Sequence, residues 1–344
     1  GGDELTILTA SWKDRPGAEI HAELPGVAIV DRRIPARALT FTWNRLEWPP
    51  VEWLAGPSDV VHAQTPLMIP TAHAARVITI HDLHFLSHPD QSRAEMRRDY
   101  PALVHQHARR ADHIVVSSQY AAGEVGRVLD VPRDRVTVCS PGAPSWAAAT
   151  ANERAIRAPG SAILFVGTLE TRKNIAGLID GYARLRACRP DAPPLVLAGR
   201  VTDSGRAALA RAKSKPLGEH IRVLGYVSDG ERRQLYRDAR MLVLPSFDEG
   251  FGLPVLEAMA CGVPVVISNR GSLPEVAGPA ALPVDPDDAE AIGDEMERLL
   301  DGDAARAATS LGLAQAGRYT WDACAGSALE AYRAALSARA RHRR

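Results

Sequence analysis

Two glutamates, Glu249 and Glu257, stand eight positions apart where a predicted helix begins. Glu257 is the one charged residue of an otherwise apolar helical run, and a buried carboxylate is costly unless it has partners. Between the two carboxylates lie free N–H groups and the positive end of the helix dipole, which favour an anion such as phosphate. This arrangement predicts a site for a molecule with a diphosphate in its middle and hydroxyl groups at both ends. The alternative is a surface Glu249 and a Glu257 that only stabilises the fold through a salt bridge.

The flanking sequence contains the elements that would position these carboxylates. Residues 240–244 form an apolar run, which is typical of a strand buried in a parallel sheet. Gly250 and Gly252 allow the backbone to turn tightly after this strand and to approach a ligand closely. Pro254 suits the first turn of a helix, and Gly262 is typical of a helix end. We therefore expect a strand, a glycine-containing turn and a short helix in succession.

The same stretch resembles the donor-site signature of glycosyltransferase family four, a group of retaining enzymes with the GT-B fold. The two glutamates and the segments 250–252, 257–260, 262–266 and 271–275 all follow this signature in register. In that family the first glutamate contacts sugar hydroxyls, the second holds the ribose, and amides of the turn hold phosphate. The resemblance therefore implies that Glu249 is catalytic and that the donor is bound by Gly250, Phe251, Gly252, Leu253 and Glu257.

The resemblance is weak before residue 59 and strong from 160 to 278, and it implies an α/β protein with the GT-B fold. Such a fold has two Rossmann-like domains whose parallel sheets face each other across a donor cleft. We expect an acceptor domain at 1–145, a donor domain at 146–320, and at 321–344 a terminal helix that crosses back, followed by a basic tail. No glycine-rich strand–helix unit precedes Leu5, so we expect the first such unit to be missing; the alternative is a divergent but complete start.

A second candidate segment follows the predicted strand 162–166. Gly167 ends this strand, and the adjacent cations Arg172 and Lys173 precede a helix, which is where α/β proteins place phosphate. The segment resembles the family's Gly-x-x-Glu-Pro-Arg-Lys-Asn motif, which implies that both cations are catalytic and neutralise the diphosphate leaving group. Thr168 stands where some mannosyltransferases have another arginine. A solvated surface pair is the alternative.

Two further turns complete the predicted donor site. Gly199 and Arg200 follow the strand 195–198, and the family places the nucleobase against the turn near Val227. Asp229, with Arg232, could accept and donate hydrogen bonds to a guanine edge, so a GDP-sugar, in particular GDP-mannose, is the favoured donor. Asp229 could equally cap the helix that follows.

The first half of the chain offers His81 and a group of tryptophans. His81 ends the strand 77–80, at the edge where α/β proteins bind ligands, and by resemblance it is the catalytic histidine beside the donor sugar. A structural histidine is the alternative. Prolines break the segment 35–57, so we expect no regular helix there. Its tryptophans, at 43, 48 and 53, are expected to pack under a long loop rather than to rest on a membrane or an acceptor.

The composition of the chain argues against several classes of function. The 344 residues carry a net charge of zero, so nothing indicates a nucleic-acid partner. Four scattered cysteines without CxxC spacing predict neither a zinc site nor a disulfide framework, and no apolar run is long enough for a membrane span. A cytoplasmic protein, at most with peripheral contact to the inner face of the membrane, fits best. Asp285-x-Asp287 resembles a metal-binding motif, but we interpret it as a helix start and expect no metal and no cofactor.

We therefore expect a retaining glycosyltransferase that moves a hexose, in particular mannose, from a nucleotide-diphosphate sugar to a hydroxyl of a glycan or lipid-linked acceptor. A dinucleotide oxidoreductase fits less well, because Val255 occupies the third glycine position and Asn269 replaces the acid that would bind ribose. A nucleotide-sugar epimerase or hydrolase of the same fold, and a non-catalytic nucleotide-sugar binder, remain as alternatives. Acceptor-dependent transfer would separate these functions.

Overall fold

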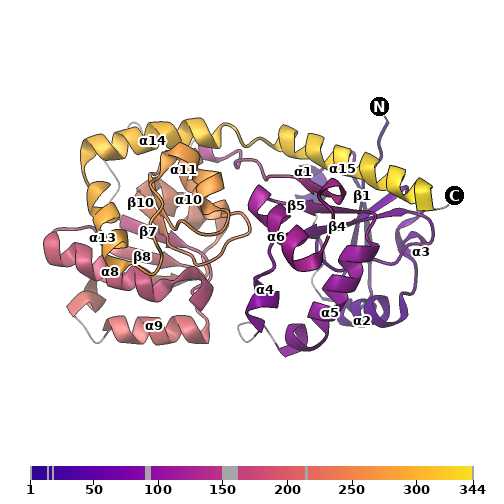
Figure 1. The fold of residues 1–344 in the computed structure, drawn as a ribbon, viewed down its shortest axis with the longest axis horizontal. Coiled ribbons are helices and arrows are strands. Elements are labelled where there is room, and N and C mark those ends of the chain that lie inside the picture. Colours follow the sequence, from indigo (N-terminus) through magenta and orange to yellow (C-terminus); the bar gives the residue numbers. More distant parts are fainter. Residues whose placement is uncertain are drawn as a thin grey trace.

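The computed structural model of the protein describes residues 2–13, 15–17, 19–89, 94–148, 162–213 and 216–342. Two α/β units lie side by side, and each is built on a parallel sheet with helices packed against it (Figure 1). The α/β class with two Rossmann-like domains, predicted from the sequence, is confirmed.

The first unit is built on a four-stranded sheet in the order β3-β4-β5-β6, with every neighbouring pair parallel. Its strands are β3 (Val60–Ala63), β4 (Ala75–Ile80), β5 (His113–Val116) and β6 (Val136–Val138). The helices around it are α4 (His84–Ser87), α5 (Ala94–Arg110), α6 (Gln119–Leu129) and the 3-10 turn η2 (Arg133–Arg135). β1 (Thr6–Ala10) pairs with β2 (Ala28–Arg32) in a separate two-stranded parallel sheet, accompanied by α1 (Glu19–Glu23), α2 (Ala36–Leu46) and α3 (Glu52–Ala55).

The second unit is built on a five-stranded parallel sheet in the order β11-β10-β7-β8-β9. Its strands are β7 (Ala162–Val166), β8 (Leu195–Ala198), β9 (Ile221–Gly225), β10 (Ala239–Leu244) and β11 (Val265–Ile267). Its helices are η3 (Thr171–Lys173), α8 (Ile175–Cys188), α9 (Asp203–Lys213), η4 (Pro216–His220), α10 (Asp229–Asp238), α11 (Leu253–Ala260), α12 (Leu273–Ala277), η5 (Gly278–Ala280), α13 (Ala289–Arg298) and α14 (Gly302–Ala316). The central strands are buried along almost their whole length, which is what helices on both faces of a sheet require.

The last helix, α15 (Trp321–His342), returns from the second unit and lies across the first (Figure 1). Ala331 and Ala335 are fully buried and pack against β4 and β5, because their small side chains let the helix approach the sheet closely. The helix continues through most of the expected basic tail, and Arg339 lies 4.0 Å from Asp112, which directly precedes β5. Residues 343–344 lie outside the described residues.

The expectation for residues 35–57 is wrong. α2 is a regular helix over Ala36–Leu46, because the prolines lie outside it: Pro35 stands at the N-cap, and the next two follow its end. The expected packing of the tryptophans is also wrong for Trp48 and Trp53, whose surfaces are 55% and 67% exposed. Only Trp43 is partly buried, and its indole N–H donates to the Pro49 carbonyl at 3.0 Å.

Three smaller points concern the rest of the chain. Residues 149–161, near the start of the expected donor domain, lie outside the described residues. Arg270 contacts both Asp285 and Asp287, and Asp288 caps α13, so this segment begins a helix as expected. Among the described residues, none of the helices combines the length and apolar character that crossing a bilayer requires.

Candidate functional site

Three glycines end three adjacent strands of the second unit. The Gly167 N–H donates to the Ala198 carbonyl at 2.9 Å, and the Gly199 N–H donates to the Gly225 carbonyl at 2.7 Å. A Cβ on Gly199, whose φ is +144°, would lie only 1.8 Å from the Gly167 carbonyl oxygen. The strand ends therefore approach one another more closely than side chains would permit, and Arg200 follows them in an exposed position.

The adjacent cations lie on η3 and converge on the carboxylate of Glu249. Lys173 is buried and forms an ion pair with one oxygen of Glu249. The Arg172 guanidinium lies 3.7 Å from the other oxygen, and it is also 3.5 Å from Asp82 and 3.3 Å from Glu170. Burial alone would lower the pKa of Arg172, but these carboxylates raise it above its ordinary value. The two cations and Glu249 thus form one cluster at the carboxyl ends of β7 and β10.

The loop 271–272 fixes the backbone of Glu249. The Ser272 N–H and hydroxyl both donate to the Glu249 carbonyl, at 3.1 and 2.9 Å. Gly271 has a φ of +65°, and a Cβ there would lie 2.8 Å from the Glu249 nitrogen. The Ser246 hydroxyl donates to the Glu249 carboxylate at 2.8 Å. The carboxylate is therefore held in place from both sides of the turn.

The turn after β10 docks onto the first unit at Gly250. Its carbonyl accepts hydrogen bonds from the hydroxyls of Ser117 and Ser118, at 3.1 and 2.7 Å. A Cβ on Gly250 would lie 1.9 Å from the carbonyl oxygen of His81. Close contact between the units therefore requires glycine here, a reason that the sequence does not reveal. The His81 side chain is exposed at this junction.

A second contact between the units supports this junction. Glu275 on α12 accepts hydrogen bonds from the backbone N–H groups of Gln119 and Tyr120, at 2.9 and 3.0 Å. These N–H groups belong to the first turn of α6, where Ser118 is the N-cap. Because a helix N-terminus favours a carboxylate, Glu275 holds the two units together beside the candidate site.

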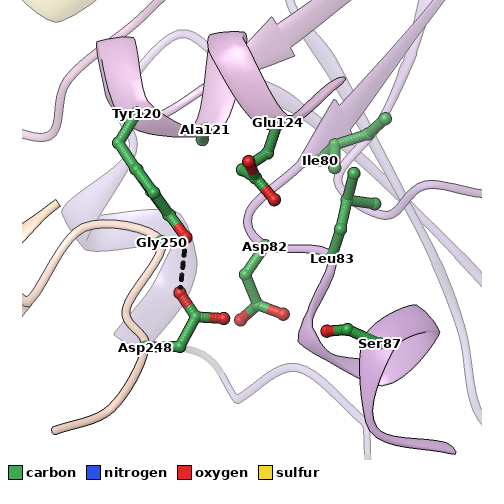
Figure 2. A pocket seen from close by; sticks show the side chains of 9 residues that line it. All are labelled: Ile80, Asp82, Leu83, Ser87, Tyr120, Ala121, Glu124, Asp248 and Gly250. Atoms are coloured by element: carbon green, nitrogen blue, oxygen red, sulfur yellow. Dashed lines mark hydrogen bonds between the residues drawn. The ribbon is translucent and has the colours of Figure 1, made fainter. Parts of the chain in front are cut away.

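A small pocket, partly open to solvent, lies between the units (Figure 2). It is lined by Ile80, Asp82, Leu83, Ser87, Tyr120, Ala121, Glu124, Asp248 and Gly250. Figure 2 shows the carboxylates of Asp82 and Asp248 pointing toward each other, with the Tyr120 hydroxyl donating to Asp248 at 3.1 Å. Burial opposes ionisation of Asp248, but hydrogen bonds from His84 and Tyr120 hold its pKa below the ordinary value. The pocket is therefore lined by three carboxylates beside the Arg172–Lys173 cluster, and Asp248 is held in its ionised form.

The second glutamate of the motif, Glu257, lies in a different environment within the second unit. It is buried, the Tyr236 hydroxyl donates to one of its oxygens at 2.7 Å, and Arg232 lies 3.1 Å from the other. Burial raises the pKa of Glu257. The Trp146 ring stacks on Tyr236 at 6.0 Å and lies 5.9 Å from the Arg232 guanidinium. This arrangement satisfies the need for partners that the sequence predicts for Glu257.

Asp229 lies at the edge of the same cluster. Its side chain is 79% exposed, and it lies 3.2 Å from Arg232. Ser228, not Asp229, caps α10, and Glu231 completes a capping box. The cap interpretation of Asp229 is therefore wrong, which leaves its carboxylate exposed beside Val227.

The predicted residues therefore gather in two groups. Arg172, Lys173, Glu249 and Gly250 meet His81 at the junction of the units, whereas Asp229 and Glu257 both contact Arg232. Val227 lies two positions before Asp229, in the turn that leads to α10. The turn residues between the groups differ in exposure. Gly252 has a φ of +97°, Leu253 is 49% exposed, and Phe251 is buried with its ring edge against Tyr319 at 5.6 Å.

Sequence reasoning missed the acidic and aromatic residues of the site. Asp82, Tyr120, Glu124 and Asp248 come from three separate segments without a shared motif. The one available signal is the place of Asp82, directly after His81 at a strand end. In the described ranges, histidine, cysteine, aspartate and glutamate side chains do not form a group of three or more that could hold a metal ion.

Comparison with known families divides the chain into the same two halves. Residues 1–145 match the family described as Glycosyltransferase Family 4, and residues 150–311 match Glycosyl transferases group 1. Both matches agree with the resemblance that the Glu249–Glu257 stretch carries.

Three known proteins illustrate the similarity. The chain is 35% identical over 284 residues to O-antigen chain mannosyltransferase B of Escherichia coli, covering 80% of this chain and 74% of that protein. It is also 35% identical over 234 residues to the serotype-specific mannosyltransferase WbdA of Escherichia coli, covering 65% of this chain but only 29% of that longer protein. The solved structure of sucrose-phosphate synthase from Thermosynechococcus elongatus superposes with a TM-score of 0.74 at 21% identity, over 98% of this chain and 90% of that one. The GT-B fold is thereby confirmed.

Proposed function

The chain belongs to glycosyltransferase family four, and from this premise we propose that it transfers mannose from GDP-mannose, with retention, to a neutral glycan hydroxyl. One observation carries the proposal: Arg172 and Lys173 converge with Glu249 where the glycine-ended strands meet the other domain. The similarity to mannosyltransferases supports mannose as the transferred sugar.

We assign the cationic cluster to the departing nucleoside diphosphate. As the sugar–oxygen bond breaks, negative charge grows on the β-phosphate, and Arg172 and Lys173 stabilise it in a partly buried site where such interactions are strong. The acceptor hydroxyl attacks from the same face, and the β-phosphate takes its proton, which retains the anomeric configuration. The cations supply the charge that a metal would otherwise provide, so the reaction proceeds without one.

We assign to Glu249 the binding of the donor sugar, and we place His81 beside that sugar. Without donor, the Glu249 carboxylate is held by Lys173, Arg172 and Ser246. Donor binding redirects the cations toward phosphate, which frees carboxylate lone pairs for the sugar hydroxyls. The exposed imidazole of His81, on the opposite domain, faces the sugar from its other side.

We assign the second cluster to the nucleoside. Glu257 accepts the ribose hydroxyls, sharing its oxygens with Tyr236 and Arg232. The exposed carboxylate of Asp229 beside Val227 accepts from the guanine edge. A uracil offers no amino donor there, so this contact favours GDP over UDP.

We assign the acidic pocket to the acceptor. Asp82, Glu124 and Asp248 offer acceptors to sugar hydroxyls, and their cationic partners Arg172 and Arg127 are not among the residues that line the pocket. Like charges in a partly desolvated site repel. The pocket therefore selects a neutral sugar terminus over a phosphorylated one.

We further propose that the protein works at the cytoplasmic face of a membrane. The exposed rings of Trp48 and Trp53 lie 6.0 Å apart, and tryptophan favours the interface between lipid headgroups and water. Sedimentation with phosphatidylglycerol vesicles tests this: the double variant Trp48→Ala/Trp53→Ala should bind less than the wild type. Equal sedimentation of both proteins would contradict the proposal.

The full chain, incubated with GDP-mannose and a mannose-terminated oligosaccharide, tests the main function. We expect an α-linked mannose by NMR, unchanged rates with EDTA, and faster transfer than from UDP-glucose or UDP-mannose. Replacing Asp229 with Ala should reduce the preference for GDP over UDP. Release of free mannose without acceptor-dependent product would indicate a hydrolase instead, and inversion at the anomeric carbon would contradict retention.

A further inference from the structure

Two cysteines meet where the chain passes between the domains. Cys139 directly follows β6, and Cys324 lies in the first turn of α15. Their sulfur atoms are 3.2 Å apart, and the Cys139 sulfur is also 3.0 Å from the Cys324 carbonyl oxygen. Both thiols are partly buried and neither is in a disulfide. A contact this close between residues 185 positions apart arises only from the fold.

The backbone around the two cysteines forms a pivot between the two domains. The Ala143 N–H donates to the Tyr319 carbonyl at 2.9 Å, so the outgoing and returning crossings are hydrogen-bonded to each other. A Cβ on Gly142 would lie 2.4 Å from the Trp321 nitrogen, so the two crossings are also in direct steric contact. Any rotation of one domain against the other must be absorbed by these short segments. The two thiols lie at the side of the pivot that belongs to the first domain.

We propose that Cys139 and Cys324 form a reversible disulfide that ties the two crossings together and slows the enzyme. The bond requires the sulfurs to approach to about 2.0 Å, a small movement from their present contact. The tie joins the first turn of α15 to the end of β6. When the cleft opens for product release, less of the backbone can then change conformation to allow the domains to rotate. Turnover therefore falls.

A low-molecular-weight disulfide such as glutathione disulfide is the oxidant. The Cys324 thiolate attacks one of its sulfurs, breaks the S–S bond and releases one glutathione thiolate. Cys139 then attacks the Cys324 sulfur of the mixed disulfide and releases the second glutathione, which takes the Cys139 proton. Two electrons and two protons leave the protein as two glutathione thiols, and one protein S–S bond forms. Burial raises the pKa of the Cys139 thiol above its ordinary value, so this second step becomes faster as the pH rises.

The test uses the full chain equilibrated with defined ratios of glutathione disulfide to glutathione. Peptide mapping by mass spectrometry should find a Cys139–Cys324 crosslink, and alkylation should count two remaining free thiols of the original four. Turnover should fall by roughly threefold or more and return with dithiothreitol, as expected where domain opening limits the rate. The thiol readout needs no donor or acceptor, so it is independent of the proposed function.

Matched variants distinguish the Cys139–Cys324 disulfide from oxidation of the other cysteines. Cys139→Ser and Cys324→Ser should each abolish both the crosslink and the loss of turnover, with melting temperatures showing that they fold. Cys188→Ser, which removes an exposed thiol elsewhere, should leave both effects unchanged. Absence of the crosslink at high disulfide ratios would overturn the proposal. A crosslink that forms without changing turnover would overturn the regulatory role.

Discussion

The two glutamates of the proposed donor site lie in different electrostatic settings. Glu249 contacts two cations at the junction of the domains, whereas Glu257 is held within one domain by a phenol hydroxyl and a single guanidinium. Burial raises the pKa of Glu257, so its partners do not fully compensate for the loss of water around its charge. The same residue type, eight positions apart in one motif, therefore faces two cations at one end and a single cation at the other.

This difference indicates how the work of the site is divided. The cations around Glu249 can follow charge that changes during the reaction, because the donor's phosphates compete with the carboxylate for them. The partners of Glu257 face a ribose whose charge does not change. We therefore expect the first end of the site to govern the chemical step and the second end to govern donor affinity.

The largest expected effect comes from Lys173→Ala. Lys173 faces charge that grows only as the sugar leaves, so kcat should fall about 10²–10³-fold, as for other lost transition-state donors. Some loss of donor affinity will accompany it, because the ground-state diphosphate is already anionic. Steady-state kinetics with varied donor measure both parameters.

The control is Arg189→Ala, which removes an exposed cation of the same domain that is paired with Asp191. It should change kcat by less than about twofold, since exposed ion pairs contribute little. If Lys173→Ala raises KM and leaves kcat intact, the proposed division between the two ends of the site is wrong.

Sequence reasoning identified the residues that we assign to the donor but not those that we assign to the acceptor. The donor residues follow one another along strand ends and turns, so glycines, cations and glutamates at fixed spacing identify them locally. The acidic pocket has no such spacing, because Asp82, Glu124 and Asp248 meet only when the domains pack together. Composition and motifs carry no information about that packing.

One wrong prediction and one contact that the sequence does not reveal have the same physical origin. The prolines around residues 35–57 suggested a broken segment, but they flank the helix α2 instead of interrupting it. The two cysteines at the pivot have no sequence spacing that links them, yet the return of α15 brings their sulfurs together. Local signals identify which residues are unusual, and tertiary packing decides what they do.

A smaller effect is expected from Glu257→Ala. Loss of charge-assisted hydrogen bonds to ribose, each worth roughly 1.5–3 kcal/mol and not fully additive, should raise the donor KM about 10²-fold with little change in kcat. Truncation also leaves the buried Tyr236 hydroxyl without this acceptor, so melting temperatures must accompany the kinetics.

Glu295→Ala is the matched control for this variant. Glu295 is also a buried helix carboxylate paired with an arginine, Arg298, but it lies on α13 away from the site. It should cost stability without raising the donor KM. A loss of kcat in Glu257→Ala as large as that in Lys173→Ala would show that the two ends are not distinct.

The smallest effect, on stability, compares the two charge states of Glu257. Because its pKa in the folded protein is raised, the folded state binds a proton more tightly than the unfolded state just above the ordinary pKa of 4.5. The ionised carboxylate therefore costs stability, and this cost appears as the pH rises through 4.5 toward the raised pKa. Glu257→Gln carries no such cost and keeps an acceptor for Tyr236. Its stability relative to wild type should increase between pH 4.5 and 7, by about 1.4 kcal/mol per unit of pKa shift.

Urea denaturation of both proteins across this pH range measures the difference in the free energy of unfolding. Groups that titrate identically in the two proteins cancel in this difference. The remaining dependence of the difference on pH therefore comes from residue 257 and the groups coupled to it. Arg232 opposes the expected trend, since the amide also loses the ion pair at 3.1 Å. The raised pKa of Glu257 means that the cost of desolvation outweighs that ion pair. The stability of Glu257→Gln relative to wild type should therefore still increase with pH. A difference that stays flat, or that favours wild type as the pH rises, would mean that Arg232 and Tyr236 compensate the buried charge fully. The Glu257 end of the site would then be as well neutralised as the Glu249 end.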